Sequence, residues 1–92
     1  MKTFLCSLYN SSTGHYSPPL LFETKEQAAT TFVNEIQAPN SELFNIKDRL
    51  TIYAIGRYDY TSGKISPYLF KKLILNGSEV LGAQHDSASI NS

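Results

Sequence analysis

The sequence has few of the residues that build disulfide-bonded or metal-bound scaffolds. Its 92 residues include one cysteine, Cys6, two histidines, His15 and His85, and no tryptophan. A single cysteine excludes an intrachain disulfide and indicates a reducing compartment. The two histidines lie far apart, so the chain lacks the ligand spacing of a structural zinc site. We therefore expect a fold that depends on its hydrophobic core, with no metal and no cofactor.

Long hydrophobic runs and an excess of charge are also missing. No apolar run approaches the about 20 residues of a membrane-spanning helix, and the N-terminal run is too short and too interrupted for a secretory signal. Eight basic and eight acidic residues give a formal net charge of zero. A domain that binds nucleic acid non-specifically is usually basic. Neutrality therefore argues against strong polyanion binding and leaves a local basic patch open.

Catalytic patterns are equally sparse. The five glycines are scattered, so no phosphate-binding loop forms, and no nucleophile pairs with a histidine and an acid at a recognisable spacing. Glu23 and Glu26 lie at the start of a predicted helix, where the helix dipole accounts for them. We expect a protein that is not an enzyme.

The sequence that is present predicts one small α+β domain over residues 1–81, followed by a polar, disordered tail at residues 82–92. Two-residue alternation predicts a strand over residues 2–9, and residues 10–14 have the composition of a turn. Residues 15–22 could return as a second strand. Pro18 and Pro19 lack N–H donors, which limits that strand to a sheet edge.

One helix is predicted over residues 24–37. Thr24 and Gln27 fit a capping box, and Pro39 ends the helix. An apolar stripe at helical spacing holds Ala28, Ala29, Phe32, Val33 and Ile36. We expect Phe32 and Ile36 to anchor the core and residues 38–48 to form a connector.

The stretch from Leu50 to Leu69 predicts a β-hairpin, because β-branched and aromatic residues alternate along it. The turn ends at Gly63, which takes a positive φ without strain. If Asp59 faces Lys64, then Tyr58 opposes Ile65, Arg57 opposes Ser66, Ile55 opposes Tyr68 and Tyr53 opposes Phe70. Together with the helix, this predicts an antiparallel sheet of three to five strands with the helix packed on one face.

This register separates two surfaces of the hairpin. The expected core face carries Ile52, Ala54, Tyr58, Ile65 and Leu69. The other face carries Tyr53, Ile55, Arg57, Tyr68 and Phe70, which is unusually aromatic for a surface in water. Aromatic rings flanked by cations bind single strands without reading their sequence. The candidate nucleic-acid-binding residues are Tyr53, Arg57, Lys64, Tyr68, Phe70, Lys71 and Lys72.

Two other interpretations of this aromatic face stay open. It can be a protein interface, in particular a homodimer contact through Tyr53, Ile55, Tyr68 and Phe70. It can also be ordinary core that the N-terminal strands cover.

Several features together resemble a known family. They are Pro18-Pro19 followed by Phe22, a helix with Ala28 and Phe32, and the segment LTIYAIGRYD closing on TSGKI. This combination, covering roughly residues 18–67, resembles the small nonstructural protein of gokushoviruses, the single-stranded-DNA phages of the Microviridae. The positions that match its motif are Tyr53, Gly56, Asp59 and Gly63.

The resemblance implies a non-capsid phage protein that acts in DNA replication, at the switch toward single-stranded genome synthesis and packaging. It implies DNA binding in the cytoplasm of an infected bacterium and brings no catalytic residues. Two hypotheses follow. In one, a replication accessory binds single-stranded DNA through the aromatic hairpin face. In the other, an adaptor uses that face to bind itself, the phage initiator or a host replication protein, away from any membrane.

Overall fold

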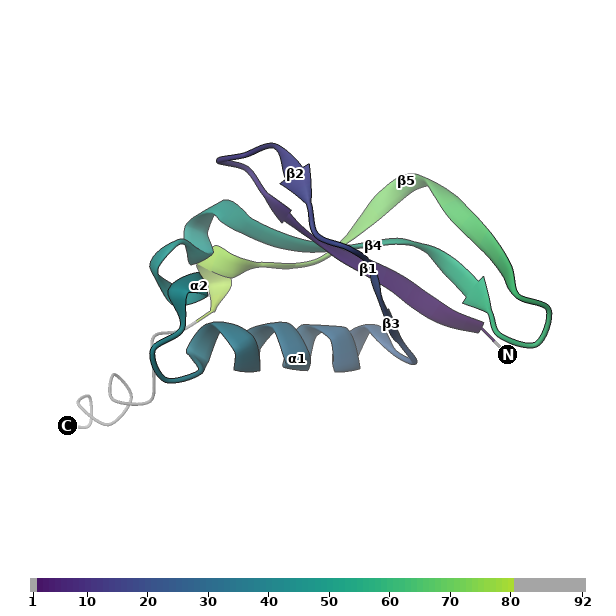
Figure 1. Cartoon of the computed structure of the whole chain (residues 1–92), viewed down its shortest axis with the longest axis horizontal. Coiled ribbons are helices and arrows are strands. Elements are labelled where there is room, and N and C mark those ends of the chain that lie inside the picture. The colour runs from purple at the N-terminus through teal and green to yellow at the C-terminus, as the bar shows by residue number, and fades with distance from the viewer. Residues whose placement is uncertain (1, 81–92) are drawn as a thin grey trace.

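Five antiparallel strands and one long helix form the part of the chain that a computed structural model describes, residues 2–80 (Figure 1). The elements are β1 (Lys2–Asn10), β2 (His15–Tyr16), β3 (Leu20–Phe22), α1 (Lys25–Gln37), α2 (Glu42–Asn45), β4 (Leu50–Asp59) and β5 (Lys64–Asn76), with short 3₁₀ turns at Lys47–Arg49 and Gly77–Glu79. The predicted α+β class is confirmed. The predicted domain limit at residue 81 and the tail at residues 82–92 lie outside the described residues.

The sheet has the strand order β2-β1-β4-β5, with β3 also paired to β1. β1 and β4 pair along the whole length of β1, from Lys2 with Asp59 to Asn10 with Leu50. The predicted strand at residues 15–22 is divided into β2 and β3 around Pro18-Pro19. Ser17 bridges the interruption, because its N–H donates to the Leu8 carbonyl at 2.8 Å and its Oγ accepts from the Leu8 N–H at 3.0 Å.

The start of α1 confirms the predicted cap at Thr24, with the return bond of Gln27 shifted by one residue from Thr24 to Glu23. The Thr24 Oγ1 accepts a hydrogen bond from the Gln27 N–H at 3.0 Å, and the Gln27 Oε1 accepts one from the Glu23 N–H at 2.9 Å. These two bonds satisfy backbone donors that have no partner within the helix. The connector contains one turn of helix that we did not predict, α2, whose first turn is capped by the Ser41 Oγ accepting from the Leu43 N–H at 3.1 Å.

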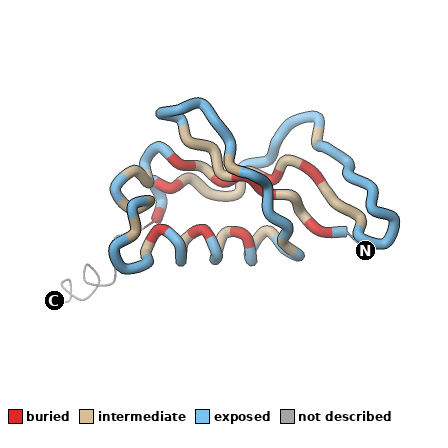
Figure 2. The backbone as a smooth tube through the Cα atoms, viewed as in Figure 1, coloured by how far each residue is buried: buried red, intermediate tan, exposed pale blue. Residues whose placement is uncertain are grey.

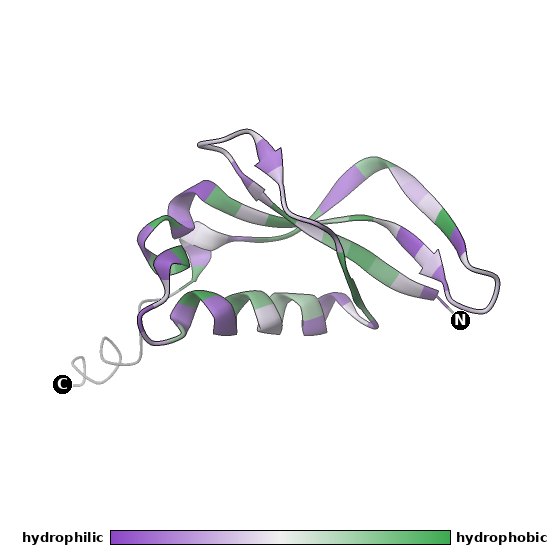
Figure 3. Cartoon of the chain, in the orientation of Figure 1, coloured by the Kyte–Doolittle hydropathy of each residue, from purple (hydrophilic) through white to green (hydrophobic). Residues whose placement is uncertain are grey.

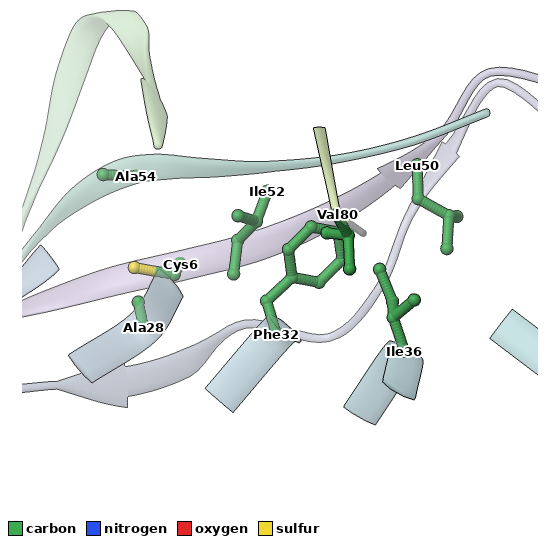
Figure 4. Packing of buried hydrophobic residues seen from close by; sticks show 8 residues of the cluster. All are labelled: Cys6, Ala28, Phe32, Ile36, Leu50, Ile52, Ala54 and Val80. Carbon is green, nitrogen blue, oxygen red and sulfur yellow. The ribbon is translucent and has the colours of Figure 1, made fainter. Parts of the chain in front are cut away.

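The core lies between α1 and one face of the sheet (Figure 2). Ala28, Phe32 and Ile36 point from α1 toward the strands, as the spacing predicts (Figure 4). The buried apolar side chains that complete the cluster are Cys6, Leu50, Ile52, Ala54 and Val80. Phe32 and Ile36 are therefore core anchors.

The hairpin register is confirmed near the turn and wrong beyond it. Asp59 pairs with Lys64, Tyr58 with Ile65 and Arg57 with Ser66, and Gly63 has a φ of 78°. Farther along, Ala54 pairs with Lys72 and Tyr53 with Leu73, so Ile55 does not oppose Tyr68 and Tyr53 does not oppose Phe70. Between Pro67 and Lys72 the β5 chain arches out of the ladder (Figure 1).

The register on the β5 side changes because residues 68–71 lie unpaired opposite Ile55, and it shifts again between Tyr53 and Ile52. Ile55 is also skipped on the β1 side. On the β1 side, Leu5 pairs with Gly56 and Cys6 with Ala54. The β5 backbone approaches Gly56 so closely that a Cβ there would lie 2.8 Å from the Ser66 carbonyl oxygen. An extra residue in one strand reverses the alternation of faces beyond it.

The reversal overturns part of the predicted core face. Ile52 and Ala54 are buried as expected, but Ile65 is 58% exposed and Leu69 is 89% exposed. Arg57 leaves the aromatic face and lies over the ring of Phe4, with 4.2 Å between the guanidinium carbon and the ring centroid.

Truncation of Phe32 to alanine should lower the free energy of unfolding by about 3–5 kcal/mol, because it leaves a cavity in the only layer between α1 and the sheet. The total free energy of unfolding of a native domain is only about 5–15 kcal/mol. Thermal or urea unfolding measures the change. Thr30→Ala, at an exposed site on the same helix, serves as the control and should shift stability by less than about 0.5 kcal/mol. Equal stability of wild type and Phe32→Ala would contradict the packing described here.

Candidate nucleic-acid interface

Three tyrosines gather on the sheet face turned away from α1. Since Ile52 and Ala54 point into the core, their neighbour Tyr53 points to the opposite face. β1 pairs Ser7 with Tyr53, which places Tyr9 on the same face two residues farther along. β2 then pairs Tyr16 with Tyr9.

The three rings contact one another. The ring centroids of Tyr9 and Tyr16 are 4.7 Å apart, and each lies 6.4 Å from that of Tyr53. The ammonium nitrogen of Lys71 lies 5.0 Å from the centroid of Tyr53. We call Tyr9, Tyr16, Tyr53 and Lys71 the tyrosine face. Tyr16 is 47% exposed, so this face offers an aromatic surface to a ligand in solution.

The seven candidate residues from the sequence do not share one surface. Tyr53 and Lys71 belong to the tyrosine face. The Lys72 ammonium lies 4.7 Å from the ring of Tyr68, and that ring packs against the edge of the core. Lys64 and Phe70 are exposed at the hairpin end and on the β5 arch. Arg57 lies over Phe4, so the prediction of a single face is wrong, because the β4 irregularity and the β5 arch separate its members.

Tyr9 and Tyr16 were missed as candidates. The alternation over residues 2–9 already places Ser7 and Tyr9 on one side, and a hairpin at residues 10–14 brings the next tyrosine back toward Tyr9. The structure closes that turn with the Gly14 N–H donating to the Asn10 carbonyl at 2.8 Å. The alternation and the turn could have indicated Tyr9 and Tyr16. Their contact with Tyr53, however, requires β4 to pair with β1, and these two strands are far apart in the sequence.

Charge is distributed unevenly although the total is zero. The five strands carry five basic side chains, Lys2, Arg57, Lys64, Lys71 and Lys72, and one acidic side chain, Asp59. The helical segments carry five acidic side chains, Glu26, Glu35, Glu42, Asp48 and Glu79, and three basic ones, Lys25, Lys47 and Arg49. The sheet layer is therefore basic and the helical layer acidic.

The acid of the matching motif, Asp59, has a structural role. Its Oδ1 accepts a hydrogen bond from the Thr61 N–H at 2.9 Å, and this bond holds the pKa of the carboxyl below its usual value. Because a hydrogen bond to the charged form stabilises it, Asp59 fixes the hairpin turn as a carboxylate.

A second feature lies on the other side of the sheet. A pocket of about 260 Å³ opens between α1, β1 and β3, and its floor includes Cys6, Leu8 and Ile52. Burial raises the pKa of the Cys6 thiol to about 11, against an opposing effect of the positive charge of Lys25. Within residues 2–80, no three His, Cys, Asp or Glu side chains form a group that could hold a metal ion. No helix in this described part is long and apolar enough to cross a membrane.

Comparison with known proteins assigns the chain to a family. Residues 3–80 match the family model described as Phage ORF5 protein. The chain belongs to this family. The ORF5 match includes all of the strands and helices described above except Lys2, the first residue of β1. No curated protein and no solved structure matches the chain.

We expect the Cys6 thiol of this ORF5 protein to react slowly with iodoacetamide at pH 8, because the thiolate is the reactive form and the folded state disfavours it. Mass spectrometry after timed quenching measures the rate, and the same chain in 8 M urea is the control. Since the pKa rises on folding from 9.0 to about 11, stability from this group is full below about pH 9 and is lost as the pH rises toward 11. Equal rates of alkylation with and without urea would contradict the buried position.

Proposed function

We propose that this ORF5 protein is the small nonstructural protein of a gokushovirus-type phage of the Microviridae. In this proposal it is a non-enzymatic accessory of DNA replication that binds single-stranded DNA in the cytoplasm of the host bacterium. The match to a phage protein family supports a phage protein. The motif residues Tyr53, Gly56, Asp59 and Gly63 support the narrower assignment to a gokushovirus-type phage.

The observation that carries the proposal is the tyrosine face. Stacking of bases on aromatic rings tolerates any sequence, because every base has a π-face. The rings of Tyr9, Tyr16 and Tyr53 lie within 6.4 Å of one another. The pairing of β2 with β1 and of β1 with β4 brings the three rings together before any ligand binds. Lys71 beside Tyr53 supplies a cation that can meet a phosphate of the stacked strand.

The charge distribution is consistent with weak, salt-sensitive binding. The basic side chains of the strands outnumber the acidic ones, while the acidic helical layer faces away from the tyrosine face. Among the cations of residues 2–80, Lys71 alone contacts the tyrosine face, and Lys64 and Lys72 are exposed elsewhere on β5. About one to three phosphate contacts per chain are therefore expected, so log K should fall with log salt with a slope of about −0.7 to −2.

Replacing Tyr16 by alanine should weaken binding to a thirty-base single strand by about 1–3 kcal/mol, for oligonucleotides of any base composition, because a stacking partner is lost. Tyr60→Ala is the matched control: Tyr60 is 50% exposed, similar to Tyr16, but lies in the hairpin turn away from the tyrosine face. Fluorescence anisotropy at low salt measures both. No detectable binding by wild type, or equal losses in the two variants, would reject the proposal.

Replacing Lys71 by alanine should reduce the steepness of the salt dependence by about 0.7, the value for one phosphate contact on a single strand. Titrations at four or more salt concentrations give the slope. Lys47→Ala, in the helical layer, should leave the slope unchanged. A slope that neither variant alters would remove Lys71 from the interface.

A second candidate function is supported by a different observation. Leu69 and Phe70 are exposed on the β5 arch, which is typical of a protein interface. The protein would then be an adaptor that binds itself, the phage initiator or a host protein, and a homodimer stays a prediction. An arch variant such as Phe70→Asp should leave DNA affinity unchanged if the two surfaces act separately.

A further inference from the structure

The β5 arch presents two large apolar side chains to solvent. Leu69 is 89% exposed and Phe70 is 78% exposed, and the crest of the arch is the hydrophobic stretch at the top of β5 in Figure 3. The next two residues, Lys71 and Lys72, are exposed cations. Side chains alternate along a strand, so Phe70 shares a face with Lys72, whereas Leu69 and Lys71 point to the tyrosine face. Phe70 with Lys72 is thus an apolar knob with a cation beside it.

The pocket between α1 and β3 has the complementary character. Its walls include Phe22 and Phe32, and Leu20 and Glu35 lie at its exposed rim. A cavity of roughly 150 Å³ lined by aliphatic and aromatic side chains holds a benzene ring. A pocket of about 260 Å³ therefore has room for the ring of a phenylalanine.

The knob and the pocket lie at opposite edges of the sheet. β5 ends the strand order on one side, whereas β3 pairs with β1 on the other side. No residue of β5 lines the pocket, so the knob of a chain does not fill its own pocket.

We propose that the β5 arch of one copy inserts Phe70 into the α1–β3 pocket of another copy. Glu35 at the rim of the pocket then meets Lys72 of the arch. This charge complementarity is what favours a second copy as the occupant, since the cationic knob and the acidic pocket rim belong to the same chain and are present at equal concentration.

The position of the two surfaces determines the type of assembly. A two-fold dimer requires one self-complementary patch, whereas a knob and a pocket on opposite edges form a head-to-tail contact. Each pair then keeps one free knob and one free pocket, so assembly continues to a ring or an open chain. The contact is centred on one aromatic side chain and is small, so its affinity should be at the weak end of specific interfaces. The proposal does not depend on DNA binding.

Sedimentation velocity of the full chain without DNA, at concentrations from ten to several hundred micromolar, tests the contact. The mass should rise with concentration past that of two chains of 10.3 kDa. Phe70→Asp and Leu20→Lys should each weaken association at least about tenfold, because a buried anchor is lost. The controls are Ile65→Asp, exposed on β5 outside the arch, and Leu21→Lys, the neighbour of Leu20 that does not line the pocket. Both controls should assemble as wild type does, and thermal melts should show all four variants folded.

Mixing the two disrupted variants distinguishes a head-to-tail assembly from a symmetric one. Phe70→Asp keeps its pocket and Leu20→Lys keeps its arch, so together they should form a one-to-one dimer and stop there. The proposal is overturned if wild type stays monomeric or stops at a dimer. It is also overturned if the mixture fails to pair while wild type assembles, or if the control variants lose assembly as well.

Discussion

The close contact between Gly56 and the β5 backbone is the constraint on which the rest of the structure depends. A Cβ at this position would lie 2.8 Å from the Ser66 carbonyl oxygen and 3.0 Å from the Pro67 Cα. Glycine allows the two backbones to approach, and Ile55 beside it drops out of both ladders. Pro67 has no N–H to continue the ladder. The arch of β5, the exposure of Leu69 and Phe70, and the position of Arg57 over Phe4 all follow from this point.

The sheet presents two faces of different chemistry. On one side, α1 covers Ile52 and Ala54 and leaves an apolar pocket beside β3. On the other side, Tyr53 contacts Tyr9 and Tyr16 beside Lys71. A net charge of zero conceals this polarity, because the acids lie mainly in the helical segments and the bases mainly in the strands. The zero net charge of the whole chain therefore argues less strongly against nucleic-acid binding once the positions of the charges are known.

Local signals determined what the sequence could predict. The helix cap at Thr24, the apolar stripe through Phe32 and the turn at Gly63 each depend on neighbours within a few residues, and all three are confirmed. The register beyond Ser66 depends on a non-local contact, and Gly56 has no sequence mark that distinguishes a close approach from an ordinary strand position. The tyrosine face was only partly predicted for the same reason: Tyr53 was a candidate, whereas Tyr9 and Tyr16 join it through pairings that span the chain.

The most direct test of whether the tyrosine face binds single-stranded DNA is an NMR titration of the ¹⁵N-labelled protein with an oligothymidine, in which the chemical shifts of the backbone amides are followed. We predict that the largest shifts fall at Tyr9, Tyr16, Tyr53 and Lys71, on strands β1, β2, β4 and β5. Amides on the exposed side of α1, such as that of Thr30, should stay in place. Largest shifts along α1, or no shifts at any accessible concentration, would contradict this prediction.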